Sequence, residues 1–206
     1  MPMNNLMPDF VKLPIRELPF VILDLETTGF KPEESGITEV AIITMTNGKE
    51  EFFETLVDPE MPVPPSITQI TGITDNMVRG KPTIRELAPI LEELFRDKIF
   101  VAHNVPFDWS FLDYSFRKHL RKPLRMPSLC TLRLARKYLG LNSNKLSSVA
   151  DYFKIDLVNA HRAMNDTRAV KDILFRMFES LESKGIKTGQ DLYSHNLIFP
   201  DFPPAR

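Results

Sequence analysis

The sequence contains a single cysteine, Cys130, among its 206 residues. One cysteine cannot form an internal disulfide, and it cannot supply the several thiolates of a cysteine-based zinc cluster. The sequence also lacks long apolar runs, since none approaches the roughly 18 apolar residues that a membrane-spanning helix needs. Its start lacks the basic residues and apolar stretch of a secretory signal. These absences predict a soluble, cytoplasmic protein that has no membrane partner.

Net charge is nearly absent as well. The formal charge is −1 at pH 7, so the molecule as a whole has no field that would attract nucleic acid. An acidic region comprises Glu50, Glu51, Glu54, Asp58 and Glu60. A later region is basic and comprises Arg117, Lys118, Arg121, Lys122, Arg125, Arg133, Arg136 and Lys137. A basic stretch can bind phosphates, but it is more often one solvated face of a helix, so charge alone leaves both interpretations open.

Length and composition indicate one globular domain with short ends. Domains commonly have about 100–200 residues, and a hydrophobic content of 43% is enough for a sizeable core. The 17 prolines include several before residue 20 and others near residue 203, which predicts extended or irregular ends. We therefore expect an N-terminal arm over residues 1–18, a domain over 19–183 and a C-terminal tail over 184–206.

Three strands are predicted in the first third of the chain. Residues 20–26 are a short, mostly apolar run followed by Thr-Thr-Gly, which is typical of a buried strand that ends in a turn. Residues 37–45 and 51–57 are the second and third strands. The dipeptide Asn47-Gly48 between them is the strongest short signal for a hairpin, so these two strands should pair antiparallel.

The segment after these strands is predicted to be irregular before it becomes helical. Residues 59–65 are rich in proline, and short turns are expected over 67–77. Thr83 and Glu86 match a capping box at the start of a helix. Pro89 should bend or restart that helix, because proline lacks the backbone N–H.

Helices then alternate with short strands. Residues 99–102 form a fourth strand, and Pro106 suits the first position of a helix that reaches about His119. Further helices are predicted over 131–138, over 146–153 and from about residue 165. The last of these has apolar residues at three- and four-residue steps from Val170 to Leu181, which gives it one continuous apolar face. The order of elements implies a mixed sheet covered by helices.

Three acids point toward the same part of this sheet. Asp24 and Glu26 are two residues apart on a strand and therefore project from the same face. Neighbouring carboxylates raise each other's pKa unless a cation or a donor compensates, although two solvated acids at a strand end would look the same. Asp166 lies four residues before Val170 and continues the apolar stripe toward the sheet. An acid at a helix start often serves as a cap, but capping does not explain why three acids face one sheet.

A histidine and a further aspartate each have two interpretations. His161 lies five residues before Asp166, about 140° around a regular helix, and is therefore predicted on the loop that enters the helix. Near carboxylates it can serve as a general base, because its unperturbed pKa is about 6.5. Asp108 falls in the first turn of its helix, where the helix dipole is a sufficient reason for an acid. Phe107 is either a core residue or a ring on which a base stacks.

Three motifs resemble those of the DEDDh (DnaQ-like) 3′–5′ exonucleases, a family that includes the proofreading subunit of DNA polymerase III and the exonuclease domain of PolC-type polymerases. The motifs are Asp24-Leu-Glu-Thr-Thr-Gly, His103-Asn-x-x-Phe-Asp108 and His161-x-x-x-x-Asp166. They have the order and spacing typical of the family, and the resemblance extends over about residues 19–183. A lone Asp-x-Glu would be a weak indication, whereas three motifs in register with every acid and the histidine present are a strong one.

The resemblance implies a site for two divalent cations, Mg²⁺ or Mn²⁺, which suit hard oxygen ligands. Asp24, Glu26 and Asp166 would hold one cation, and a second would lie near Asp24 and Asp108. In such sites the two ions are about 3.5–4 Å apart. His161 would take a proton from the attacking water, a role worth about 10²–10⁴-fold in rate.

The resemblance also implies contacts with the substrate. The backbone around Thr27 would meet the terminal 3′-hydroxyl, and Ile70 and Phe107 would pack against the last bases. The whole implied set is Leu25, Thr27, Ile70, Thr71, His103, Asn104 and Phe107. Many proofreading subunits have a glutamate and a histidine where this chain has Ser66 and Thr71. That difference leaves the catalytic set intact and leaves open how the 3′ end is held.

The expected fold is ribonuclease H-like α/β, with a mixed sheet of about five strands, three of them antiparallel, and helices on both sides. The expected activity is hydrolysis of terminal phosphodiesters from the 3′ end, with single-stranded DNA as the leading substrate and nucleoside 5′-monophosphates as products, in proofreading or repair. RNA trimming and degradation of short oligonucleotides use the same chemistry and stay open, as does a polymerase partner. A non-catalytic replisome-binding module is disfavoured, because a structural role does not require so many clustered acids.

Overall fold

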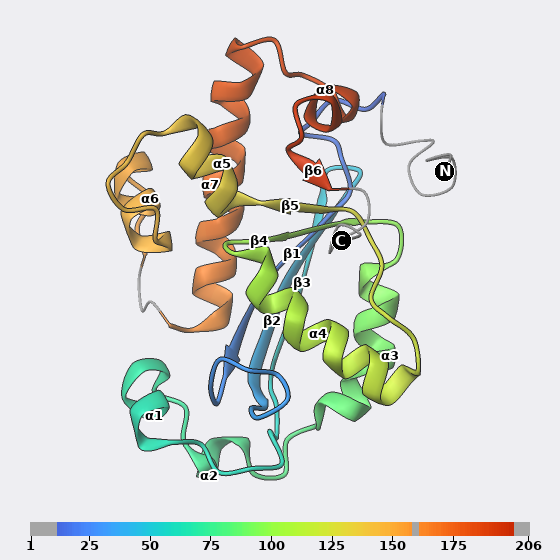
Figure 1. Cartoon of the computed structure of the whole chain (residues 1–206), viewed down its shortest axis with the longest axis vertical. Coiled ribbons are helices and arrows are strands. Elements are labelled where there is room, and N and C mark those ends of the chain that lie inside the picture. Colours follow the sequence, from blue (N-terminus) through green and yellow to red (C-terminus); the bar gives the residue numbers. More distant parts are fainter. Residues whose placement is uncertain (1–11, 158–160, 200–206) are drawn as a thin grey trace.

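The computed structural model describes residues 12–157 and 161–199, and six strands of this part form one sheet in the order β3-β2-β1-β4-β5-β6 (Figure 1). The strands are β1 (Phe20–Thr27), β2 (Ile37–Thr46), β3 (Lys49–Leu56), β4 (Ile99–Ala102), β5 (Ser128–Cys130) and β6 (Ile198–Phe199). The helices are α1 (Pro65–Thr71), α2 (Asp75–Val78), α3 (Ile84–Phe95), α4 (Val105–Leu120), α5 (Thr131–Tyr138), α6 (Leu146–Phe153), α7 (Ala163–Ser183) and α8 (Gly189–Ser194).

The sheet is mixed, and the expected α/β class is confirmed. β1, β2 and β3 pair antiparallel, whereas β4 runs parallel to both β1 and β5. Asn47 and Gly48 both have positive φ, and Thr46 pairs with Lys49 across them, as the hairpin prediction requires. The sheet has one more strand than the five expected, because β6 pairs antiparallel with β5.

Alternation along β1 distributes its side chains between two cores. Phe20 and Ile22 belong to the core under α5, α6, α7 and α8, and the ring of Phe20 lies 5.8 Å from that of Phe178 on α7. Val21 and Leu23 belong to the core under α3 and α4. Because side chains of a strand point alternately to its two faces, Asp24 has the same parity as Phe20 and Ile22 and therefore lies on the α7 face.

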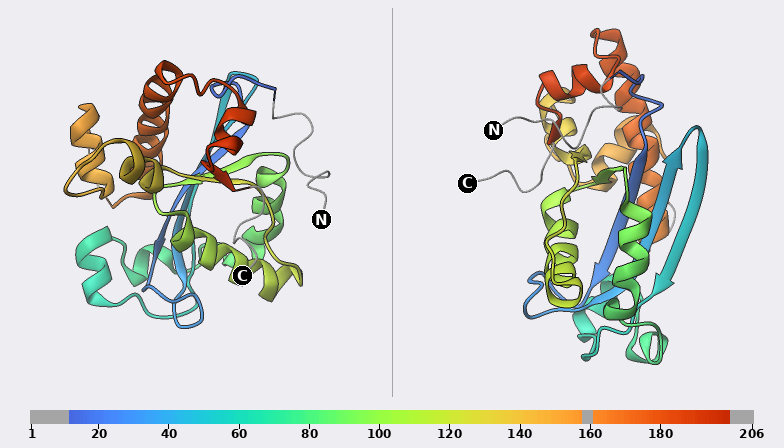
Figure 2. Two further views of the ribbon diagram at one scale, coloured as in Figure 1. Left: turned by 45° about the horizontal axis from the view of Figure 1, so that its top comes forward. Right: turned by 90° about the vertical axis from the view of Figure 1, so that its right-hand side faces the viewer.

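The twist of the sheet leaves the C-terminal half of β1 open on one side. β4 and β5 are strongly rotated relative to β1 (Figures 1 and 2), as the twist of mixed sheets allows. Pairing between β1 and β4 therefore covers only Phe20 to Ile22. Beyond Ile22, β1 pairs with β2 alone. The first turn of α4 follows β4 directly and comes beside this open edge.

Several helix predictions are confirmed, and others need correction. α5 and α6 have the predicted bounds, and α7 begins at Ala163, two residues before the predicted start. α3 runs through Pro89 without restarting, since Pro89 is on the exposed side of the helix while Leu87 and Leu91 beside it are buried and hold it to the core. The segment expected to form turns is helical in α1, which starts with Pro65 at its first position and ends at Gly72 in the left-handed conformation.

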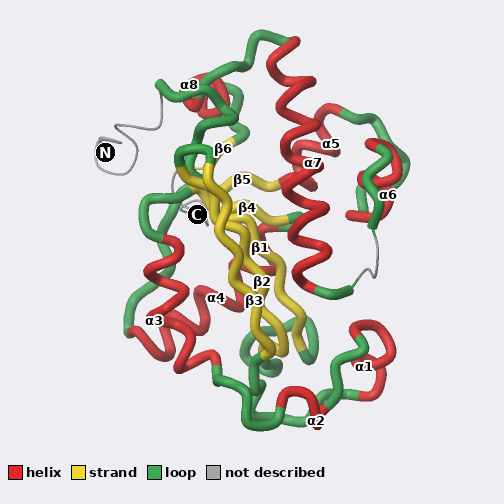
Figure 3. Tube along the Cα trace, turned by 180° about the vertical axis from the view of Figure 1, so that it is seen from behind, coloured by secondary structure: helices red, strands yellow, loops and turns green. Residues whose placement is uncertain are grey.

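The end of the chain is also more regular than an extended tail. Thr188 and Asp191 form a capping box that starts α8, and β6 follows to complete the sheet. Leu192 and Ile198 are buried in the same core as α7. α8 lies at the opposite end of the molecule from α1 and α2 (Figures 1 and 3). Among the described residues, no helix has both the length and the apolarity needed to span a bilayer.

Candidate active site

β1 carries two carboxylates to the α7 face of the sheet. Asp24 and Glu26 are both half-buried, while Leu25 between them is buried in the core on the other face. The register with β2 shifts between Glu26 and Thr27, where the strand ends. Thr27 then donates its hydroxyl to the carbonyl of Gly29 at 2.6 Å, which fixes the turn that follows the carboxylates.

α7 carries the third carboxylate and the histidine. Asp166 is in its first turn and is 6% exposed, and the apolar stripe through Val170 holds that face of the helix against the sheet. His161 is exposed on the loop before the helix and has a φ of +69°. Its backbone N–H donates to Oδ2 of Asp166 at 3.0 Å, so the aspartate fixes the position of the histidine backbone.

α4 carries the fourth carboxylate from the open edge of β1. Asp108 is 4% exposed in the first turn of α4. Its carboxylate accepts hydrogen bonds from its own backbone N–H and from the N–H of Leu25 on β1. The missing neighbour strand beyond Ile22 leaves this side of β1 free for such a bond. The bond therefore links α4 directly to the strand segment that carries Asp24 and Glu26.

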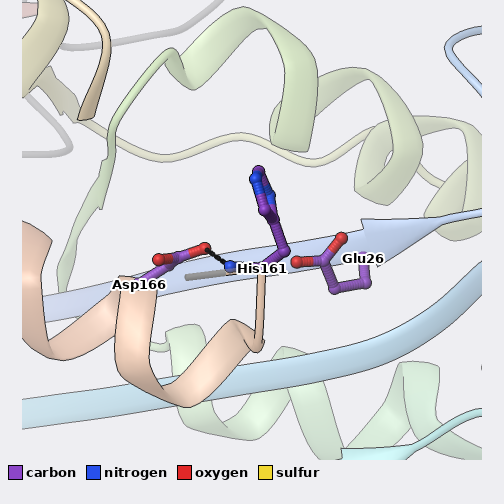
Figure 4. A group of neighbouring side chains, drawn as sticks. All are labelled: Glu26, His161 and Asp166. Carbon is purple, nitrogen blue, oxygen red and sulfur yellow. Dashed lines mark hydrogen bonds between the residues drawn. The ribbon is translucent and has the colours of Figure 1, made fainter. Parts of the chain in front are cut away.

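The predicted site residues converge in space. Ligand atoms of Glu26, His161 and Asp166 lie within 4.8 Å of one another, and the imidazole stands between the two carboxylates (Figure 4). Asp24 interacts electrostatically with Asp108 as well as with Glu26 and Asp166. Three elements far apart in sequence thus bring four carboxylates and one histidine together, as the motifs predict.

The cluster strongly favours protonation in the absence of cations. Burial, and then repulsion from Asp108 and Glu26, raise the pKa of Asp24 well above its ordinary value. Burial and the charge of Asp166 raise the pKa of Glu26 to about 8. Burial raises the pKa of Asp108 to about 7, against its two backbone hydrogen bonds, which lower it. Burial also raises the pKa of Asp166. Such shifts are expected where like charges share a poorly solvated site.

A fifth carboxylate, Glu39, was not identified from the sequence. It lies directly opposite Glu26 in the β1–β2 register, and its side chain is 1% exposed. It accepts hydrogen bonds from Nη2 of Arg162 at 2.8 Å and from the backbone N–H of Ala163 at 3.0 Å. The signal was present, because a buried acid within the apolar strand 37–45 requires a partner.

The Glu39–Arg162 pair fixes the start of α7. Arg162 is the N-cap residue of that helix and directly follows His161. The ion pair and the hydrogen bond from Ala163 join the start of α7 to Glu39 on β2. The hydrogen bond from the backbone of His161 to Asp166 joins the residue before the helix to its first turn. His161 is therefore held between two anchored positions, which suits a residue that must act with a fixed geometry.

The cluster fits divalent cations. Oδ1 of Asp166 is buried and accepts no hydrogen bond from the described residues, although a buried acceptor normally has a partner. Several carboxylate oxygens converge with it, and hard oxygen ligands are those that Mg²⁺ and Mn²⁺ prefer. A cation would supply the missing partner of Asp166 and would stabilise the ionised form of the buried acids, whose pKa values are raised first by burial.

Two residues expected to contact substrate make internal bonds. The ring of His103 has Nδ1 2.9 Å from the hydroxyl of Thr131 and Nε2 2.9 Å from the carbonyl oxygen of Asn144. Thr71 is buried, donates its hydroxyl to the carbonyl of Ile67 and accepts from the N–H of Ile73. The contact with Asn144 holds His103 against the loop before α6, and the hydrogen bonds of the Thr71 side chain stabilise the end of α1.

Three others are open to solvent. Ile70 on α1 is 53% exposed. Asn104 is exposed at the N-cap of α4 with a φ of +106°. Phe107 is half-buried, with its ring centroid 5.2 Å from that of Phe111. Their exposure leaves part of each side chain available to a ligand.

A cluster of carboxylates that needs cations, set on a mixed sheet of this topology, defines the class of metal-dependent nucleases. A family model described as an exonuclease, RNase_T, matches residues 21–174. The chain is 38% identical over 164 residues to the DNA polymerase III subunit epsilon of Aquifex aeolicus, covering 79% of this chain and 81% of that protein. It is 37% identical to the PolC-type DNA polymerase III of Caldanaerobacter subterraneus, covering 85% of this chain but 13% of the length of that much longer protein.

Solved structures have the same fold. Exonuclease X in complex with 5′ overhanging duplex DNA has a TM-score of 0.66 and 25% identity, covering 83% of this chain and 96% of that one. The nuclease domain of 3′hExo, a DEDDh family member bound to rAMP, has a TM-score of 0.69 and 16% identity, covering 82% and 95%. The chain belongs to the exonuclease family that the model describes, and it is a 3′ exonuclease of the DEDDh type with a ribonuclease H-like fold.

Proposed function

We propose that this exonuclease uses two divalent cations, Mg²⁺ or Mn²⁺, to hydrolyse the terminal phosphodiester of single-stranded DNA from its 3′ end. The observation that carries the proposal is the convergence of four carboxylates whose charges are unbalanced, one of them with a buried oxygen that lacks a hydrogen bond among the described residues. The products would be nucleoside 5′-monophosphates, and the biological role would be proofreading or repair.

Each carboxylate has a proposed part in holding the cations. Asp24, Glu26 and Asp166 would hold one, and Asp24 with Asp108 would hold the other. When bound, the cations would supply positive charge against the charge that develops on the phosphate. The hydrogen bond from Leu25 keeps the Asp108 carboxylate against β1, so the acids from the strand and from α4 keep a fixed separation.

His161 would act as the general base. It is exposed, and its ligand nitrogen lies within 4.8 Å of ligand oxygens of Glu26 and Asp166. An imidazole at that position can take a proton from a water molecule that attacks the phosphorus. The bond between its backbone and Asp166 keeps the base beside the acids.

The substrate end would be held beside the acids. We propose that the backbone around Thr27 meets the terminal 3′-hydroxyl and that Ile70 and Phe107 contact the last bases. Leu25 would contribute through its backbone alone, since its side chain is in the core. Thr71 and His103 would shape the site rather than bind through free side-chain donors, given their internal bonds, whereas the exposed Asn104 would contact the substrate.

The preference for DNA rests on the names of relatives. One relative is the epsilon subunit of DNA polymerase III, another is a PolC-type DNA polymerase III, and one structural relative was solved with duplex DNA. A polymerase partner is proposed on the same ground. RNA trimming or degradation of short oligonucleotides is the alternative, and it is favoured by the relative that was solved with rAMP.

The test is metal-dependent shortening of a 5′-labelled oligonucleotide. Asp166→Asn should lower kcat by about 10³-fold, because it removes a carboxylate whose interactions with cations are worth several kcal/mol. Asp172→Asn is a matched control on the same helix, since the side chain of Asp172 is 54% exposed and outside the cluster. Full activity in Asp166→Asn, or activity in excess chelator, would disprove the assignment.

Rates on matched substrates decide between the alternatives. Single-stranded DNA, single-stranded RNA, duplex DNA and a dinucleotide would be compared at equal cation concentration. The proposal expects the highest kcat/KM for single-stranded DNA. A higher kcat/KM for RNA or for the dinucleotide would assign the enzyme to the alternative function.

A further inference from the structure

An open pocket with basic walls lies at the C-terminal end of α4. Its volume is about 520 Å³, and it is lined by Glu60, Arg85, Lys118, His119 and Arg121. Three permanent cations therefore face one carboxylate. Burial lowers the pKa of His119 most, and the charges of Lys118 and Arg85 lower it further. A concave surface of this kind attracts anions.

The basic residues between Arg117 and Lys137 have different partners in the structure. Several of its cations are engaged elsewhere: Arg117 pairs with Asp113, Lys122 pairs with Glu92, Arg133 stacks on Phe199 and Lys137 donates to the carbonyl of His195. Arg136 and Lys137 line a second pocket beside α5. Only part of the stretch, Lys118 and Arg121, joins Arg85 in the pocket at the end of α4.

One flank of α4 connects the carboxylate cluster with this pocket. Phe107, Tyr114 and Lys118 are seven and four residues apart, so they lie on the same flank of the helix. Phe107 directly precedes Asp108, and the Lys118 ammonium lies 5.7 Å from the centre of the Tyr114 ring. Phe107 and Tyr114 are half-buried and Lys118 is exposed. Along this flank the two half-buried rings come before the exposed cation in order of distance from the acids, and the ring of Phe111 between them is buried in the core.

The opposite wall of the pocket is tied to the loop after β1. Glu60 lines the pocket, and the next residue, Met61, accepts a hydrogen bond on its sulfur from the hydroxyl of Thr28 at 3.2 Å. Thr28 follows the strand that carries Asp24 and Glu26. The segment between β3 and α1 therefore lines the basic pocket through Glu60 and contacts the loop after β1 through Met61.

We propose that this flank of α4 and its pocket bind the substrate strand upstream of the bond that is cut, which rests on the proposed function. Phe107 and Tyr114 are stacking surfaces for bases, and Lys118, Arg121 and Arg85 contact phosphates. Flat rings followed by cations are the combination that single-stranded nucleic acid needs, whereas an acidic peptide would need only the cations.

The dimensions of α4 set the length of strand that reaches the pocket. Asp108 and Lys118 are ten residues apart, which at 1.5 Å per residue is about 15 Å along the helix. At a rise of about 3.4 Å per stacked nucleotide, 15 Å corresponds to about four nucleotides. Substrates shorter than about four nucleotides therefore do not reach Lys118 and Arg121, and longer ones do.

The experiment measures binding and cleavage against substrate length. Fluorescein-labelled single strands of two, four and eight nucleotides are titrated with the wild type and with the double variant Lys118→Glu/Arg121→Glu. Binding is measured by fluorescence anisotropy in a buffer with Ca²⁺, and kcat/KM for cleavage is measured with Mg²⁺. The variant should lose about tenfold or more in affinity for eight nucleotides and less than twofold for two. The slope of log affinity against log salt should fall by about 1.4, since each lost phosphate contact removes about 0.7 on a single strand.

Two further variants test whether the strand binds in the pocket at the end of α4 or in the second pocket, and whether Tyr114 stacks on a base. Arg136→Glu/Lys137→Glu is the matched control in the second pocket and should cost less than threefold for eight nucleotides. Tyr114→Leu should weaken the eight-nucleotide strand about tenfold without changing the salt slope, because it removes stacking rather than charge. Melting temperatures of all three variants verify that they fold.

The outcomes also distinguish this inference from the proposed function. If the wild type cleaves oligonucleotides but Lys118→Glu/Arg121→Glu loses affinity equally at all lengths, or loses none, the strand path is wrong and the nuclease function stands. If the wild type cleaves nothing yet the eight-nucleotide strand depends on Lys118 and Arg121, the function is wrong and the binding surface stands. A loss found with the Arg136 and Lys137 pair instead, or competition by an acidic peptide with no oligonucleotide binding, overturns the inference.

Discussion

Removal of divalent cations should make the stability of this protein fall as pH rises. The pKa of Glu26 is raised from 4.5 to about 8, first by burial and then by Asp166, and that of Asp108 is raised from 3.8 to about 7 by burial. The folded chain therefore binds these protons more tightly than the unfolded chain does. The stability that they contribute is complete below about pH 4.5 and is lost as pH rises through 7 to 8.

The size of the effect follows from the shift at Glu26. A change from 4.5 to about 8 corresponds to about 5 kcal/mol at 1.36 kcal/mol per pKa unit. Glu26 is half-buried, and water and monovalent ions that enter the site screen the repulsion. We therefore expect the free energy of unfolding in chelator to fall by about 2–3 kcal/mol between pH 5 and pH 9, a large part of a typical total of about 5–15 kcal/mol.

The assay is urea unfolding at pH 5, 7 and 9, in chelator and in Mg²⁺. Mg²⁺ at about 100 times its Kd should restore about 2.7 kcal/mol at pH 9. Glu26→Gln should be more stable than the wild type at pH 9 in chelator, because the amide carries no charge, and Mg²⁺ should stabilise it less. Glu51→Gln, on the exposed edge strand β3, is the control and should follow the wild type.

Two results would refute this reasoning. One is a free energy of unfolding in chelator that is constant or rises between pH 5 and pH 9. The other is a Glu26→Gln variant that is less stable than the wild type at pH 9 in chelator. Either would mean that burial, with the repulsion between the acids, does not raise the pKa of Glu26 in the metal-free protein.

Three further predictions concern the surroundings of the site. Glu39→Gln should lower kcat about tenfold, because it loosens the start of α7 that positions His161. The same change should have little further effect in a His161→Ala background, since both changes act through one group, and additive losses in this double-mutant cycle would contradict the role of Glu39. Gly36→Ala would place a Cβ 2.6 Å from the Cβ of Pro59, so the loop after β1 must shift at a cost of about 1–3 kcal/mol and the melting temperature should drop. An unchanged melting temperature would show that the loop adapts freely. Phe178→Ala should cost about 3–5 kcal/mol in urea unfolding, because the ring is fully buried beside β1, and a cost below 1 kcal/mol would mean that the core refills.

Local sequence patterns were sufficient for most of the elements. Asn47-Gly48 gave the β2–β3 hairpin, and the apolar steps from Val170 gave the buried face of α7. Both are properties of neighbouring residues, since turn type and helix face depend on spacings of two to four residues. β6 escaped prediction because it has two residues and exists only through its pairing with β5. Such a strand has no periodicity of its own.

The sequence motifs predicted the residues of the site, but not the residues that hold them in place. The motif residues named Asp24, Glu26, Asp108, His161 and Asp166, and the fold brings them together. Glu39 was missed, because its importance comes from lying opposite Glu26 and beside Arg162, which only the pairing of β1 with β2 and the docking of α7 create. His103, expected at the substrate, instead has both ring nitrogens bonded to other parts of the chain.

The sequence by itself determined the parity of Asp24 and Glu26 on one face of β1, the helical stripe that turns Asp166 inward, and the chemistry of the residues available. The tertiary structure alone decided that β4 separates from β1 after Ile22, so that Asp108 can reach Leu25, and that only some cations of the basic stretch line the two pockets. The physical reason is that side-chain periodicity fixes directions within an element, whereas twist, register and packing fix the distances between elements.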